Sequence, residues 1–184
     1  MNFIPEQKKV AVDVPFWDDV TVAAGWQGHA TTKSIDTLKL DITKAVSRLG
    51  GIVSGFQRGK FQIGKQYREG FQLHYHIETQ EGQNIPGRID IAALPVKEDW
   101  GLRNSLEKRK EKSLKMSLYM LREALNGTWF LQQLSPGYAP LMPWMLAEGE
   151  KTITQLWQES SVMQNLLPPG ETEFVEGVYR EQRT

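Results

Sequence analysis

Residues 71–78, with the sequence FQLHYHIE, decide the fold class of this chain. Large apolar and polar side chains alternate through the whole segment, which is the period of a β-strand with one buried and one solvated face. Strands with this pattern are typical of antiparallel sheets. The apolar positions are Phe71, Leu73, Tyr75 and Ile77, and the polar positions are Gln72, His74, His76 and Glu78.

Two further strand candidates flank this segment. Residues 52–63 mix apolar and polar side chains and are interrupted by Gly55 and Gly59. Glycine inside a strand often marks a bulge, so this stretch indicates two short strands or one bulged strand. After a turn, residues 88–94 predict the last strand, which ends before Pro95.

A strand and a helix are expected before the sheet. Residues 20–24, VTVAA, predict a first strand that ends at Gly25. Ser34 is suited to cap a helix that ends at residues 50–51, both glycine. The predicted order is therefore β-α-β-β-β. The helix has an apolar stripe formed by Ile35, Leu38, Ile42, Ala45, Val46 and Leu49.

The second half of the chain has helical periodicity. Residues 102–125 contain a leucine spine and predict a long helix that ends at residues 126–127, Asn-Gly. A short helix is expected over residues 129–134, and Thr152 is suited to cap a later one. The expected fold is thus α+β, with an antiparallel sheet covered by helices and followed by a helical C-terminal half.

Length and composition favour one domain. The chain has 184 residues, which is close to the usual size of a single domain. We expect this domain to cover residues 1–161, sheet-rich over 1–96 and helical over 97–161. Residues 162–184 contain a Pro-Pro-Gly turn and polar residues, and are expected to form a C-terminal tail.

Several classes of protein are disfavoured by composition. The chain has no cysteine, which excludes disulfides and thiolate metal sites. No segment approaches the roughly 18 consecutive apolar residues of a spanning helix, and the N-terminus lacks the plan of a signal peptide. We therefore expect a cytoplasmic protein with no membrane partner. Lysine plus arginine and aspartate plus glutamate number 22 each, so affinity for nucleic acid would need a local patch.

One candidate patch is the glycine-rich hairpin within residues 56–68. Proteins that bind single strands combine cations along the backbone with aromatic rings that stack on bases. The alternative is an exposed hairpin whose rings point inward and whose lysines protect a sheet edge. The candidate residues are Phe56, Arg58, Lys60, Phe61, Lys65, Tyr67 and Arg68.

A second candidate patch is the basic run at the start of the long helix, Lys108-Arg109-Lys110-Glu111-Lys112, which continues to Lys115. Its residues could contact phosphates without reading sequence. The alternative is a solvated helix face, because Glu111 and Lys115 are spaced for an ion pair. The candidates for phosphate contact are Lys108, Arg109 and Lys112.

The histidines are a third candidate. His74 and His76 share one face of their strand, with Glu78 and Asp90 as neighbouring carboxylates, and His29 could join them only if its loop folded over the sheet. Such a set can bind a divalent metal or act in acid–base chemistry. Polar residues on a solvated strand give the same pattern, so we expect no metal and no cofactor.

No phosphate-binding loop, dinucleotide fingerprint, nucleophile elbow or zinc-protease helix occurs in the sequence. A noncatalytic protein that binds nucleic acid, of the single-stranded type, is therefore the leading hypothesis. The alternative is a protein-interaction or assembly subunit, docking or self-associating through the aromatic residues 129–157. A metal-dependent enzyme that uses His74 and His76 is the third hypothesis.

Overall fold

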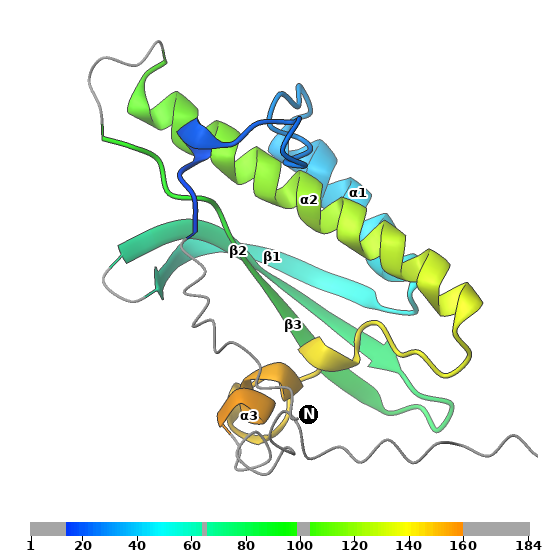
Figure 1. The fold of residues 1–184 in the computed structure, drawn as a ribbon. Coiled ribbons are helices and arrows are strands. Elements are labelled where there is room, and N and C mark those ends of the chain that lie inside the picture. The colour runs from blue at the N-terminus through cyan, green and yellow to red at the C-terminus, as the bar shows by residue number, and fades with distance from the viewer. Residues whose placement is uncertain (1–13, 64–65, 99–103, 160–184) are drawn as a thin grey trace, which may run out of the picture.

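The computed structural model describes residues 14–63, 66–98 and 104–159 (Figure 1). The strands form one antiparallel sheet in the order β1-β2-β3, and the two long helices lie side by side over the same face of it (Figure 1). The elements are η1 (Trp17–Asp19), α1 (Ile35–Arg48), β1 (Ile52–Ile63), β2 (Gln66–Glu78), β3 (Asn84–Ala92), α2 (Leu106–Leu134), η2 (Met142–Trp144), η3 (Glu148–Glu150) and α3 (Ile153–Glu159).

The predicted helix α1 is confirmed. The hydroxyl of Ser34 accepts a hydrogen bond from the Thr37 N–H at 3.1 Å, which satisfies one of the free donors at the helix start. Gly50 ends the helix with a φ of 89°, a conformation that glycine adopts without steric cost. The stripe that faces the sheet and α2 is buried at Leu38, Ile42, Ala45, Val46 and Leu49, and Ile35 packs against it.

The sheet also follows the predicted alternation. Leu73 of β2 lies opposite Phe56 of β1 and Ile89 of β3, and residues directly opposite one another share a face of the sheet. Phe71, Leu73 and Tyr75 are buried beneath the helices. β1 is one bulged strand, with the irregularity between Val53 and Gly55.

The buried Tyr75 ties the sheet to the chain that follows α2. Its hydroxyl donates a hydrogen bond to the carbonyl of Leu141 at 2.9 Å, and burial raises the pKa of this phenol well above its usual range. A bridge between Gly87 and Met145 then fastens this part of the chain along β3. Thr152 caps α3 as predicted, because its hydroxyl accepts from the Gln155 N–H and the Gln155 side chain accepts from the Thr152 N–H.

The predicted first strand is wrong. Residues 22–25 form turns that are closed by hydrogen bonds from the Ala24 and Trp26 N–H groups to the Thr21 carbonyl. Gly25 adopts a φ of 92° there, which a strand residue does not. The α+β class is confirmed, but the order of α-helices and strands over the described residues is α-β-β-β-α-α.

The predicted end of the long helix is also wrong. α2 continues through Gly127 to Leu134, so no separate helix begins at Trp129. A helical glycine costs about 1 kcal/mol relative to alanine, and tertiary contacts offset this cost. The Arg48 guanidinium stacks 4.0 Å from the Trp129 ring, which packs against the core.

Residue 102, at which the long helix was expected to begin, lies outside the described residues. Within them, no helix is long and apolar enough to span a membrane.

An ion-pair cluster joins α1 to α2 and gives a pH-dependent prediction. The Asp41 carboxylate pairs with Lys33 and with Arg122 at 3.3 Å. The hydrogen bond from Lys33 lowers the pKa of Asp41 most, burial opposes it, and Arg122 adds to the lowering. The folded protein thus binds this proton more weakly than the unfolded chain does. The stabilisation is present above the ordinary carboxyl range and is lost as the pH falls through the lowered pKa.

We expect Asp41→Asn to reduce the free energy of unfolding at neutral pH by up to about 1 kcal/mol, because the cluster is partly solvated. This difference from the wild type should shrink to nothing in acid, where Asp41 is protonated. Urea unfolding of both proteins at several pH values between neutral and acid measures it. A difference that stays constant with pH would contradict the assigned role of Asp41.

Candidate nucleic-acid interface

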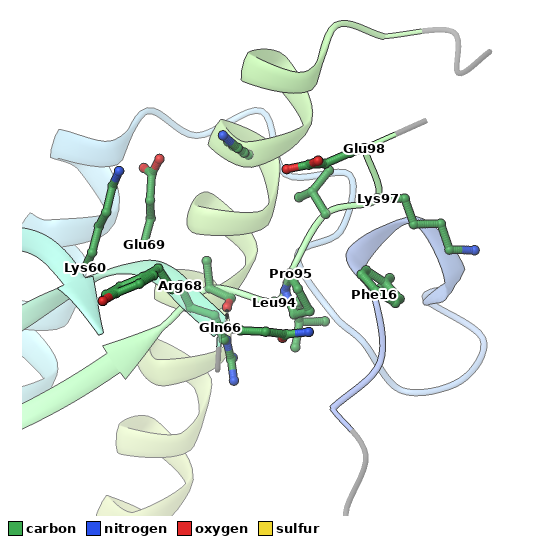
Figure 2. Close-up of a pocket in the computed structure, with 13 residues that line it drawn as sticks. Phe16, Lys60, Gln66, Arg68, Glu69, Leu94, Pro95, Lys97 and Glu98 are labelled. Atoms are coloured by element: carbon green, nitrogen blue, oxygen red, sulfur yellow. Dashed lines mark hydrogen bonds between the residues drawn. The ribbon is translucent and has the colours of Figure 1, made fainter. Parts of the chain in front are cut away.

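A cleft of about 530 Å³ opens where β2 loses its neighbour β3 (Figure 2). The pairing of β2 with β3 begins at Gly70, opposite Ala92, and one further backbone hydrogen bond joins Ala93 to Glu69, so among the described strands residues 66–68 of β2 pair with β1 alone. The chain after β3 turns away from β2 towards α2. The cleft lies between this chain segment and residues 66–69 of β2. Its lining residues are Phe16, Lys60, Gln66, Tyr67, Arg68, Glu69, Ala93, Leu94, Pro95, Val96, Lys97, Glu98 and Lys110.

The segment 93–98 forms one wall of the cleft and is held by hydrogen bonds to its neighbours. The Ala93 N–H donates to the Glu69 carbonyl at 2.7 Å, and the buried Ser113 hydroxyl of α2 donates to the Leu94 carbonyl at 2.8 Å. The Trp17 N–H donates to the Pro95 carbonyl at 2.8 Å. These contacts fix the wall against β2, α2 and η1.

Cations reach the cleft from three separate parts of the chain. Lys60 and Arg68 come from the hairpin, Lys97 from the wall and Lys110 from α2, against the acids Glu69 and Glu98. Several of these charges are paired, namely Lys97 with Asp19, Lys110 with Glu107 and Glu69 with Arg58. The lining is therefore mildly basic rather than strongly so.

The hairpin residues divide between the two faces of the sheet. Lys60 lies opposite Glu69, which shares the helix-covered face with Phe71, and Figure 2 shows Lys60 and Glu69 pointing the same way. Phe61 lies opposite Arg68 on the other face, where its ring packs over Gly70. Because the cleft lies at an open strand edge, residues from both faces of β2 line it.

The predicted hairpin residues have different surroundings. Lys60, Tyr67 and Arg68 line the cleft, and Tyr67 is 70% exposed. The ring of Phe56 packs against the core and is not displayed. Lys65 lies outside the described residues. Arg58 is exposed but pairs with Glu69 at 2.8 Å.

The two basic regions are neighbours in space. The pKa of Glu111, on α2, is lowered chiefly by a hydrogen bond from Lys115, and the charge of Arg58 on β1 adds to the effect. Lys60 and Lys110 also line the same cleft. The start of α2 therefore lies beside the hairpin, a proximity that the sequence did not require.

Among the predicted helix residues, Arg109 needs correction. Its side chain is buried and pairs with Asp18 at 3.0 Å, so it is not available to a ligand from solvent. Lys108 and Lys112 are exposed but do not line the cleft. Lys110 belongs to the predicted basic run but is not among the predicted site residues; it lies one turn before the buried Leu114 and hence towards the sheet. Lys97 and Phe16 were not predicted, because no local pattern signals them.

The three histidines do not form one cluster. His74 and His76 share one face of β2, where His74 lies opposite Arg88 and His76 opposite Pro86. His29 instead stacks on Trp17, with ring centroids 4.4 Å apart. Across residues 14–63, 66–98 and 104–159, no group of three or more histidine or acidic side chains is placed to hold a metal ion.

A different surface lies at the far end of α2, where large apolar side chains face solvent. Leu134 is 82% exposed, whereas Trp144 is half-buried against the core. We define the apolar end of α2 as Phe130, Leu131 and Leu134; Leu134 follows the other two by four and three residues, so they share one side of the helix.

Known proteins add no constraint to these sites. No protein family matches the chain, and neither a curated protein nor a solved structure is similar to it at a significant level.

Proposed function

We propose that this protein is a noncatalytic nucleic-acid-binding protein that holds a single strand in the cleft between the hairpin and the start of α2. The observation that carries this proposal is the convergence of Lys60, Arg68 and Lys110 from distant parts of the sequence on one cleft. Cations grouped in a groove attract a phosphate backbone, although the chain as a whole is neutral.

Aromatic rings at the cleft support a single strand over a duplex. Tyr67 is largely exposed, and Phe16 lies at the opposite wall, with the Lys97 ammonium 5.8 Å from its ring centre. Unpaired bases stack on such rings, whereas bases inside a duplex are already stacked. The cleft thus offers contacts for both the backbone and the bases.

We expect Lys60→Glu to weaken binding to a single-stranded oligonucleotide and to reduce the log–log salt dependence by about one unit for the lost phosphate contact. Tyr67→Ala should reduce affinity by roughly 1–3 kcal/mol with little change in that salt dependence, because a ring contributes stacking and no charge. Fluorescence anisotropy titrations with single- and double-stranded DNA and RNA at several salt concentrations measure both effects.

The matched control is Lys44→Glu, which reverses an exposed charge on α1 that does not line the cleft. Its affinity and salt dependence should stay close to those of the wild type. If the wild-type protein shows no affinity for any DNA or RNA at low ionic strength, the proposed function is wrong.

The apolar end of α2 supports a second candidate function, a subunit that assembles with another protein or with itself. Contiguous exposed apolar side chains are unusual on a monomer and mark interaction surfaces. Light scattering would give the mass of the wild type and of Leu134→Glu. A stable oligomer that Leu134→Glu dissociates would favour assembly through this surface.

A further inference from the structure

Arg68 is a cleft residue whose described partners do not balance its charge. Its Nε donates to the Ala93 carbonyl at 2.6 Å, and its Nη2 donates to the Ala92 carbonyl at 3.3 Å. Both acceptors are neutral, and the side chain is half-buried. None of the ion pairs found among the described residues includes Arg68.

Four other arginines among the described residues have acidic partners. Arg58, Arg88 and Arg109 pair with Glu69, Asp90 and Asp18. Burial lowers the pKa of Arg122 too, but its hydrogen bonds to Glu123 and Asp41 raise it more, whereas burial alone acts on Arg68 and lowers its pKa. A guanidinium stays protonated at neutral pH, so Arg68 carries a half-buried charge that has no acidic partner among residues 14–63, 66–98 and 104–159.

The geometry also shows which donors of Arg68 remain. A guanidinium carries five N–H donors, and the two carbonyls of Ala92 and Ala93 use one on Nε and one on Nη2. The Nη1 donors and the second Nη2 donor are left. Together they form the planar fork that pairs with two oxygens of one phosphate group.

We infer that Arg68 binds one phosphate group in the cleft through its Nη1 and Nη2 atoms. The backbone carbonyls of Ala92 and Ala93 hold the side chain in place for this contact. Lys60 and Lys110 line the same cleft from the helix-covered side of the sheet, so they add to its positive potential but no direct contact with this anion is assigned to them. The assignment of this phosphate to a nucleic-acid backbone rests on the proposed function, whereas the phosphate contact itself does not.

The first arm of the test uses a single-stranded oligonucleotide. Arg68→Gln should weaken binding about tenfold or more and lower the log–log salt dependence by about one unit. Arg68→Lys keeps the charge but loses the fork, so it should lose affinity with the salt dependence nearly unchanged.

The control for the first arm is Arg48→Gln, which should bind within about twofold of the wild type. Arg48 lies 3.4 Å from Asn126, which is about 24 Å along α2 from Lys110 at 1.5 Å per residue. Thermal unfolding of each variant checks that it is folded.

The second arm uses the wild-type protein and inorganic phosphate, so it does not depend on a variant that folds. Addition of phosphate should shift the ¹⁵N side-chain NMR signals of Arg68 and leave those of Arg48 in place. Phosphate binding without oligonucleotide binding would support the Arg68 site and reject the proposed function. Oligonucleotide binding that Arg68→Gln leaves unchanged, or Arg68 signals that phosphate does not move, would reject the Arg68 site alone.

Discussion

Arg109→Met is expected to lower the free energy of unfolding by about 3–5 kcal/mol, the largest effect of any single substitution considered. The side chains of Arg109 and Asp18 are 4% and 8% exposed and lie 3.0 Å apart. Removal of the arginine leaves the buried Asp18 carboxylate with no ion-pair partner among the described residues, and with the Lys97 N–H at 2.8 Å as a remaining donor. Arg109 also donates to the carbonyls of Asn104 and Lys97, so the substitution loosens the join between α2, the cleft wall and η1.

The matched control is Lys112→Met, the same kind of change at an exposed position of the same helix. Its effect should stay within about 0.5 kcal/mol. The double variant Asp18→Asn, Arg109→Met should recover part of the lost stability, because no uncompensated charge remains buried. Urea unfolding measures all three variants. A loss below about 1 kcal/mol for Arg109→Met would show that the ion pair is not structural.

Leu38→Ala and Ile42→Ala are each expected to cost roughly 2–5 kcal/mol of unfolding free energy. Both side chains are 0% exposed and belong to the core that joins α1 to α2 and the sheet. Truncation removes apolar burial and leaves a cavity that a close-packed core fills only in part.

Leu40→Ala is the control for this pair, because Leu40 lies on the same helix and is 54% exposed. It should change stability by less than about 1 kcal/mol. Chemical unfolding monitored by circular dichroism compares the three variants. Equal midpoints for all three would mean that α1 is peripheral to the fold.

Much of the fold follows from local periodicity. The alternation in residues 71–78 and the apolar stripe of α1 each arise because one face of the element is buried. Both elements could therefore be predicted from the sequence. The strand predicted for residues 20–24 was wrong because valine and threonine favour strands in general. In the structure Val20 is instead buried in a second, smaller apolar cluster together with Trp17 and Met116. The Asn-Gly pair at 126–127 misled because Trp129 and Arg48 make contacts that override a local stop signal.

The candidate site was only partly predictable, because its members lie far apart in the sequence. The hairpin cations Lys60 and Arg68 form a local pattern and were found. Lys110 and Lys97 reach the cleft only through tertiary packing. Arg109 looked like its basic neighbours, yet its partner Asp18 lies 91 residues away along the chain. No spacing rule connects such positions.

The continuity of α2 sets a geometric relation between the two candidate surfaces. Lys110 lies at the cleft and Leu134 at the apolar end, with one uninterrupted helix between them. At 1.5 Å per residue the two lie about 36 Å apart along the axis. A helix of this kind acts as a spacer, so a protein docked at the apolar end would stand clear of a strand held in the cleft. Both could occupy the molecule together without steric conflict.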